Sequence, residues 1–143
     1  MISKHDLRAY RDDLVELKQV EGRIEQIRTQ LYALRSPALT GMPHAQQVDS
    51  GSSQERSADR LSEQLNELMK RYKTDAATLA ARCAEIENAI ALLPTRYRTL
   101  LRAHYVEGLK WPDVAEIYPY SYERIMQLHR RALILLRERQ TLQ

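Results

Sequence analysis

The sequence predicts an all-α protein, in which a long helical hairpin or coiled coil precedes a C-terminal helix-turn-helix domain. The chain has only 4 Gly and 5 Pro among 143 residues, so few positions interrupt a helix. Apolar residues recur at steps of three and four over two long segments, which is the spacing of one helix face. No run alternates apolar and polar residues between turn signals, so strands are not expected.

The first predicted helix covers residues 3–35. Ser3 can cap its N-terminus, and Asp6 brings a carboxylate to the first turn, where the helix dipole favours negative charge. The apolar stripe of this helix consists of Leu7, Tyr10, Leu14, Leu17, Val20, Ile24, Ile27, Leu31 and Leu34. A helix roughly 50 Å long, at about 1.5 Å per residue, cannot bury such a stripe alone and needs a partner helix.

A polar loop is predicted over residues 36–57. Ser36-Pro37 ends the first helix, because the residue before a proline is biased away from the helical conformation. The loop contains Gly41-Met42-Pro43 and few other apolar residues. We expect His44 to be exposed and not to bind a metal, since no second ligand lies at a zinc-like spacing.

The second predicted helix covers about residues 57–93, and with the first it forms a predicted oligomerisation domain, 1–93. Its stripe is Leu61, Leu65, Leu68, Tyr72, Ala76, Leu79, Cys83, Ile86, Ile90 and Leu93. The simplest arrangement pairs the two helices antiparallel in one chain, and two hairpins then dimerise. Parallel pairing between subunits is the alternative. The residues assigned to oligomerisation are Leu14, Leu17, Ile24, Leu31, Leu65, Leu68, Leu79 and Ile86.

A second domain, 94–143, is predicted to follow because Pro94 breaks the long helix. Thr95 is the predicted N-cap of a helix over 95–107. Gly108 then suits the left-handed position that often ends a helix. The residues of this helix expected to point inward are Leu100, Leu101, His104 and Tyr105.

The helix-turn-helix is predicted from residues 111–136. A short helix over 111–118 has Pro112 in its first turn, and a longer helix over 122–136 has Ser121 as its N-cap. We expect Ala115 at the close crossing of the two helices. The residues expected to face each other are Val114, Tyr118, Ile125 and Leu128, with Ala132, Leu133 and Leu136 continuing that face. The second helix of such a motif fits the DNA major groove.

Charge is unevenly distributed along the chain. Residues 94–143 hold nine Arg and Lys against five Asp and Glu, whereas residues 1–93 hold thirteen against fourteen. The net positive charge therefore coincides with the helix-turn-helix, as a surface that binds phosphates requires. The alternative is that these charges form ordinary solvated helix faces.

The region from Leu93 to about Arg137 resembles region 4 of bacterial sigma factors. The matching positions are Leu93-Pro94, Arg96, Leu100, Tyr105, Gly108, Trp111, Val114-Ala115, Ser121, Glu123-Arg124-Ile125, Gln127-Leu128 and Ala132-Leu133. The whole chain is similar to small phage-encoded regulators of the ArpU/RinA type, in which a helical hairpin with a Gly-Met-Pro loop precedes the sigma-like module. Gly41-Met42-Pro43 fits that pattern.

The resemblance implies double-stranded DNA as the partner and the start of the last helix as the reading element. Of three family positions that contact the promoter, Glu123 is kept, while Tyr122 and Met126 replace arginines. The candidate base-reading residues are Tyr122, Glu123, Met126 and Gln127. The candidate phosphate-binding residues are Lys110, Ser121, Arg124, Arg130, Arg131, Arg96 and Arg98, and Arg102 extends the same surface. Trp111 is expected to be a packing anchor.

No catalytic, metal-binding or cofactor-binding constellation is predicted. His104 and His129 are interpreted as isolated structural or surface histidines, and Cys83 as a core residue. No Ser/His/Asp group, Gly-rich phosphate loop or Cys/His metal set is present, so an enzyme is not expected. No signal-type leader or long apolar stretch occurs, which predicts a cytoplasmic protein without membrane contact, nucleoid-associated in a bacterial host.

Three functional hypotheses follow. The first is a sequence-specific transcriptional regulator of phage origin, dimerised by its hairpin. The second is a small-terminase-like subunit that recognises DNA for packaging, which would form a large ring. The third is a coiled-coil adaptor that binds RNA polymerase or another regulator, in which case the exposed residues of the last helix would not read bases.

Overall fold

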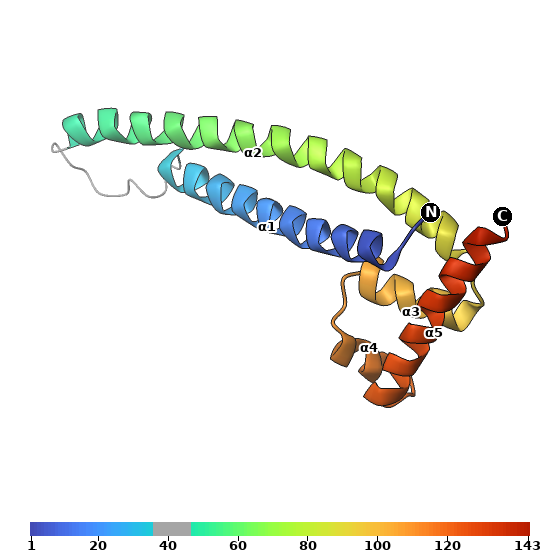
Figure 1. The fold of residues 1–143 in the computed structure, drawn as a ribbon. Coiled ribbons are helices and arrows are strands. Elements are labelled where there is room, and N and C mark those ends of the chain that lie inside the picture. The colour runs from blue at the N-terminus through green and yellow to red at the C-terminus, as the bar shows by residue number, and fades with distance from the viewer. Residues whose placement is uncertain (36–46) are drawn as a thin grey trace. The chain divides into compact units, whose positions relative to one another are not determined.

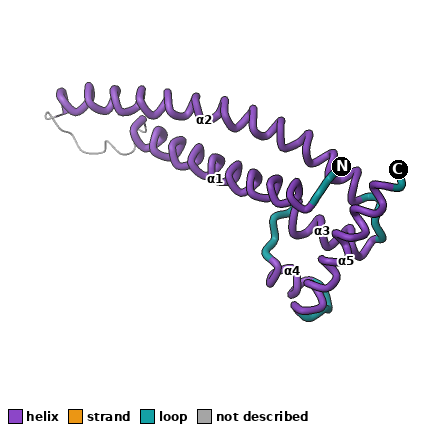
Figure 2. The backbone as a smooth tube through the Cα atoms, viewed as in Figure 1, coloured by secondary structure: helices purple, strands orange, loops and turns teal. Residues whose placement is uncertain are grey.

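The computed structural model describes residues 1–35 and 47–143, with side chains from residue 53 onward in the second segment. The expectations for Gly41-Met42-Pro43 and His44 fall outside the described residues. In chain order the helices are α1 (Lys4–Arg35), α2 (Gln47–Ile90), α3 (Thr95–Leu101), the π-helical turn η2 (Arg102–Val106), α4 (Trp111–Ile117) and α5 (Tyr122–Thr141). The described part of the chain contains no strand, so the all-α prediction is confirmed (Figure 2).

The described residues form two compact units, which we call the hairpin unit and the module unit. The hairpin unit is Leu17–Ala76, and the module unit combines Met1–Glu16 with Ala77–Gln143. Both α1 and α2 contribute residues to each unit (Figure 1). This division differs from the boundary predicted at residue 93. The assignment of oligomerisation to 1–93 and DNA binding to 94–143 stays a prediction.

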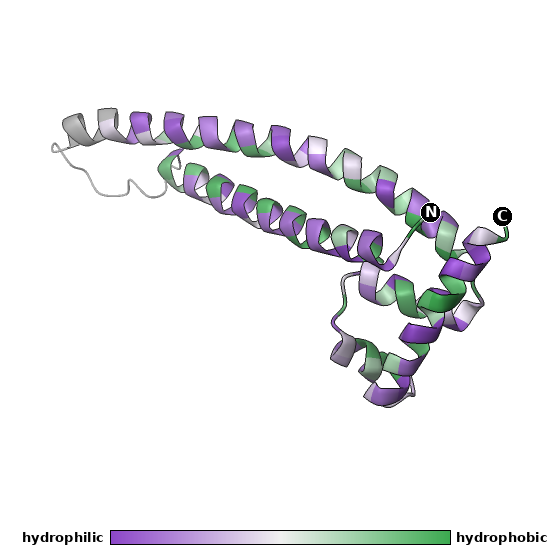
Figure 3. Ribbon diagram, viewed as in Figure 1, coloured by the Kyte–Doolittle hydropathy of each residue, from purple (hydrophilic) through white to green (hydrophobic). Residues whose placement is uncertain are grey.

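The hairpin unit is an antiparallel pair of helices. The Tyr72 hydroxyl donates to Glu21 at 2.8 Å, and Arg35 donates to the Ser62 hydroxyl at 3.1 Å. Residue numbers therefore rise along one helix as they fall along the other. This is antiparallel pairing within one chain, the first of the two arrangements considered from the sequence. Its buried core is Ile27, Leu31 and Ala58, flanked by Leu34, Leu61, Leu65 and Leu68. Figure 3 shows the hydrophobic residues on the facing sides of the two helices.

Both ends of α2 differ from those predicted. Helix α2 begins at Gln47, about ten residues before the predicted start at 57, so residues 47–57 are helical instead of looped. Extending an existing helix avoids the cost of nucleation, and a few Ser and Gly residues weaken it by less than about 1 kcal/mol each. The same helix ends at Ile90 instead of 93, where a turn from Leu93 N to the Ile90 carbonyl precedes Pro94.

The helix predicted over 95–107 is divided into α3 and η2. Pro94, not Thr95, is the N-cap residue of α3, and Thr95 is the first helical residue. In η2 the Glu107 amide donates to the Arg102 carbonyl at 2.8 Å, five residues back. Ala103, His104 and Tyr105 of this turn are all buried.

The core of the module unit draws residues from all its helices. Leu7, from the first turn of α1, is fully buried, as are Ile90, Leu101, Val114 and Ile125. Ser3 and Asp6 cap α1 reciprocally: the Asp6 amide donates to the Ser3 hydroxyl, and the Ser3 amide donates to the Asp6 carboxylate at 2.8 Å. These bonds hold the pKa of Asp6 below its usual value, and they confirm the predicted cap.

Candidate nucleic-acid interface

Helices α4 and α5 form the helix-turn-helix. Val114 of α4 and Ile125 of α5 are both 0% exposed, and Leu128 is buried with them. Tyr118, also predicted at this contact, is half-buried, and its hydroxyl donates to the Thr99 carbonyl of α3 at 3.5 Å. Ala115, expected at the crossing, is half-buried. Apolar contacts thus hold the two helices at an angle that presents the start of α5.

Ser121 caps α5 as predicted. Its hydroxyl accepts from the Arg124 amide at 3.2 Å, and its carbonyl accepts from the Ile125 amide at 2.9 Å. Helix α5 continues to Thr141, five residues beyond the predicted end. The inward face is as predicted, with Ala132 and Leu136 buried and Leu133 half-buried. The first turn of α5 therefore has a fixed start and a fixed rotation about its axis.

An aromatic cluster connects α4 and α5 to η2. The Trp111 ring stacks on His104 with centroids 3.8 Å apart and lies 4.5 Å from the His129 ring. The Tyr105 hydroxyl and His129 Nε2 share a hydrogen bond of 2.7 Å. Trp111 is thus the predicted packing anchor, but the interpretation of the two histidines as isolated is wrong. They lie 25 positions apart in the sequence, and only the fold brings them together.

Both histidines are neutral in this cluster. Burial lowers the pKa of His104 to about 4 and that of His129 to about 4, because desolvation disfavours the charged ring. His104 Nδ1 lies 2.7 Å from the Leu109 carbonyl, which can only accept, so this nitrogen carries the proton of the neutral ring. That bond also fixes the loop that leads into α4.

The loop before α4 depends on Gly108. Its φ of 80° lies in the left-handed region, as the sequence predicted, and a side chain there would be strained. Arg11 of α1 donates to the Gly108 carbonyl at 3.4 Å and to the His104 carbonyl at 3.2 Å. The His104 carbonyl lies in η2, whose last carbonyls lack partners within the helix, and the Gly108 carbonyl lies in the loop that follows. Arg11 therefore fixes the entry to the helix-turn-helix, a role that its sequence position does not indicate.

The N-terminal residues also hold the far end of α5. The Ile2 amide donates to the Gln140 side-chain oxygen at 2.7 Å, and the Gln140 side-chain nitrogen donates back to the Ile2 carbonyl at 2.7 Å. Sequence reasoning missed this contact because its partners are 138 residues apart. Both ends of the helix-turn-helix are thus braced by the first three turns of α1 and the residues before it.

The predicted base-reading residues lie at the start of α5 with different exposure. Tyr122, Glu123 and Gln127 are exposed, whereas Met126 is half-buried. The Gln127 side-chain oxygen accepts from Arg124 at 3.2 Å. This contact is exposed, so water or a base edge can replace it at little cost. Three of the four side chains are open to a partner, and the fourth is partly open.

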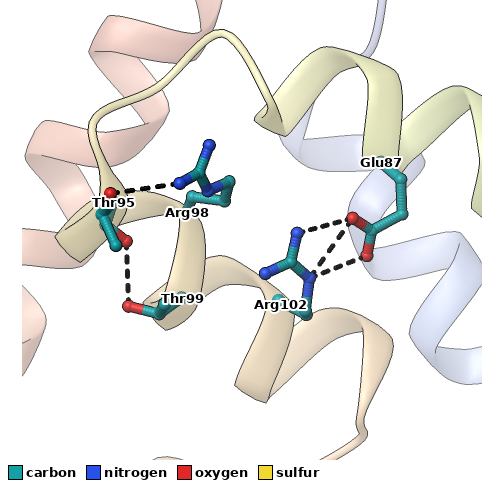
Figure 4. Close-up of polar contacts among 5 residues, drawn as sticks. All are labelled: Glu87, Thr95, Arg98, Thr99 and Arg102. Atoms are coloured by element: carbon teal, nitrogen blue, oxygen red, sulfur yellow. Dashed lines mark hydrogen bonds and ion pairs between the residues drawn. The ribbon is translucent and has the colours of Figure 1, made fainter.

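The predicted phosphate-binding side chains are mostly exposed. Lys110, Ser121, Arg124, Arg130, Arg131 and Arg96 are exposed, and Arg98 is half-buried. Arg98 donates to the Thr95 hydroxyl at 3.1 Å (Figure 4). Arg96 lies over the Tyr97 ring. Within residues 1–35 and 53–143, no carboxylate forms an ion pair with any of these cations. Their charges are therefore available to an anionic partner.

Arg102 is not part of that surface, contrary to the prediction. It forms a two-point ion pair with Glu87 of α2, at 3.0 Å from Nε to Oε1 and 2.7 Å from Nη2 to Oε2 (Figure 4). The hydrogen bonds from Arg102 lower the pKa of Glu87. The pair joins the end of α2 to η2, so Arg102 serves the structure of the module unit.

The eight predicted oligomerisation residues divide into two groups. Ile24, Leu31, Leu79 and Ile86 are buried within the single chain, so they cannot contact another copy without rearrangement. The other four, Leu14, Leu17, Leu65 and Leu68, are half-buried and keep some apolar surface exposed. The fold of one chain already buries the first group, so their assignment to oligomerisation stays a prediction, and the second group has more surface left for another copy.

These features define a helix-turn-helix module of the kind that presents its second helix to a partner. Residues 83–136 match the family model of sigma-70, region 4. The match begins in α2, ten residues before the predicted start, and lies wholly within the module unit. No curated protein and no solved structure matches the chain. Among the described residues, no helix is long and apolar enough to cross a membrane.

Proposed function

We propose that this protein is a sequence-specific DNA-binding transcriptional regulator. The observation that carries the proposal is the first half of α5, where exposed polar side chains are flanked by cations without carboxylate partners, on a module similar to sigma-70 region 4. Exposed Lys and Arg bind phosphates and set the position of the module, while Glu123 and Gln127 lie where a recognition helix meets base edges.

Glu123 and Gln127 suit different bases. A carboxylate accepts from the amino group of cytosine, and a carboxamide both donates to and accepts from adenine. The two side chains lie one turn apart on α5, so they would read neighbouring base pairs. Glu123 also interacts favourably with the dipole at the helix start, so it would stabilise α5 in the absence of DNA as well.

We propose further that the protein acts as a dimer in a phage-infected bacterial cell. Resemblance to the ArpU/RinA type supports the phage origin, through the module and Gly41-Met42-Pro43. The half-buried residues Leu14, Leu17, Leu65 and Leu68 support dimerisation, because a second hairpin would cover their exposed surface. A dimer doubles the DNA contacts and raises the affinity of a small module.

Light scattering of the full chain tests the dimer. We expect twice the chain mass of 16.7 kDa, and a monomer for Leu17→Glu/Leu65→Glu that keeps its helical circular dichroism. The control is Val15→Glu, which changes a side chain that is already exposed. A ring of eight or more subunits would instead favour a DNA-packaging subunit.

Selection from a random duplex pool tests the function. We expect the wild type to enrich one motif, and Glu123→Ala/Gln127→Ala to lose preference at adjacent positions while still binding DNA. Glu138→Ala, an exposed change in the last turns of α5, should enrich the wild-type motif. Failure of the wild type to enrich any motif would refute sequence-specific binding, and it would favour an adaptor that contacts protein.

A further inference from the structure

An exposed apolar patch lies at the junction of α4 and α5. Ile117 is 61% exposed, Tyr120 40% and Tyr122 51%, and all three fall within six residues. The core of the junction is complete without them, because Val114 and Ile125 are fully buried. Three large apolar side chains that add nothing to the core and are exposed within one short segment indicate a binding function.

The exposed charges around the patch are of both signs, since Asp113, Glu116 and Glu123 are exposed as well as two cations. Lys110 precedes α4 and Arg124 lies in the first turn of α5, both exposed and without a carboxylate partner in the described residues. Position and not charge decides the occupant: the patch adjoins the first turn of α5, which the proposed function places in the major groove of DNA. Within that groove, the thymine C5-methyl is the apolar group that the bases present.

We propose that Tyr122, with Tyr120 and Ile117, binds thymine methyl groups and so makes recognition depend on them. This inference rests on the proposed DNA binding and adds the chemical class of base that the module selects. Tyr122 is the first residue of α5, and the Ser121 cap holds that turn in place. The residues at the start of a recognition helix are those that reach base edges.

The test is a uracil scan of the duplex most enriched by selection. Each thymine is replaced in turn by deoxyuracil, which removes only the methyl group. We expect one or two positions at which the wild type loses about fourfold in affinity, the equivalent of burying one CH₂ group. The Tyr122→Ser variant should bind the thymine duplex and the deoxyuracil duplex with equal affinity. The effect of removing the methyl group would then depend on the Tyr122 side chain, which is the sign of a direct interaction between them.

Two variants separate the apolar contact from other effects. Tyr122→Phe should keep the methyl dependence, because the aromatic face and not the hydroxyl makes the contact. Tyr32→Ser changes a tyrosine of α1 that is 76% exposed and should bind both duplexes as the wild type does. Equal affinity of the wild type for every thymine and uracil duplex would overturn the inference while leaving DNA binding intact. Absence of any selected duplex would overturn both.

Discussion

The module unit and the hairpin unit are built from the same kinds of residue, yet they bury them to different degrees. Seven of the eight largest fully buried side chains belong to the module unit, and Ile27 alone belongs to the hairpin unit. Helices around a common core can cover a side chain from several directions, whereas two paired helices cover only one face. The module unit therefore has the larger buried core within one chain, and the hairpin unit keeps half-buried apolar side chains that a partner could cover.

The largest expected effect comes from opening the core of the module unit. Ile125→Ala should destabilise the protein by about 3 kcal/mol, because a fully buried side chain leaves a cavity. Leu65→Ala, at a half-buried site in the hairpin unit, should cost about 1 kcal/mol at low protein concentration. Urea unfolding measures both. Equal costs for the two substitutions would contradict the difference in packing.

Acid should act on the module unit through its histidines. Their pKa values, about 4 in the folded protein against 6.5 as the ordinary value, mean that the unfolded chain binds more protons between these pH values. Stability is therefore full above about pH 6.5 and falls as the pH approaches 4, on the order of 2 kcal/mol for each histidine.

Unfolding measured from pH 7 to pH 4.5 tests this dependence. His129→Phe keeps a ring in the cluster and removes one titrating group, so it should flatten the pH profile. A wild-type profile that is flat over this range would show that the cluster does not hold the two rings neutral.

Loss of the α5 cap should have a smaller effect. Ser121→Ala removes the acceptor for the Arg124 amide and should cost about 1 kcal/mol. Because the first turn would fray, affinity for a selected duplex should fall as well. Ser121→Asp supplies another acceptor and should restore stability, and calorimetry of the three proteins compares them. An unchanged melting temperature in Ser121→Ala would mean that the cap does not hold the turn.

The smallest effect is expected at the ion pair between α2 and η2. Glu87→Gln should cost about 1 kcal/mol or less, because both side chains are about a third exposed and water screens the pair. Glu85→Gln, an exposed change two residues earlier, is the matched control. The difference in urea midpoint between the two variants measures the pair, and a larger loss in the control would contradict its role.

Local patterns predicted the helices, and long-range contacts supplied the rest. Apolar spacing predicted both long helices. Ser3 and Ser121 were correctly predicted as helix N-caps, and Gly108 as a residue with positive φ, because both features depend on neighbouring residues alone. The early start of α2 was missed because Ser and Gly favour loops only weakly against a helix that is already formed.

The support of the candidate site could not be predicted in this way. No neighbouring residue indicates that Arg11 binds the Gly108 carbonyl, which is 97 residues away. Arg102 was predicted to be a surface cation, and its pairing with Glu87 is seen only in the folded structure. The exposed residues of α5 were predictable, because helical spacing separates them from Ile125 and Leu128. The exposure of a helix side chain follows from the period of the helix, about 3.6 residues. The contacts of Arg11 and Arg102 depend on tertiary structure, which the sequence pattern does not contain.

The central claim is that the start of α5 reads bases while the surrounding cations bind phosphates. It is tested most directly by the ratio of affinities for the selected duplex and a scrambled duplex at one salt concentration. We expect a ratio of about 10³ or more for the wild type. Glu123→Ala/Gln127→Ala should lower it by roughly 10-fold or more, whereas Arg131→Gln should weaken binding to both duplexes equally and leave the ratio unchanged. A wild-type ratio near one, or an Arg131→Gln variant that loses specificity while the double variant keeps it, would contradict the account.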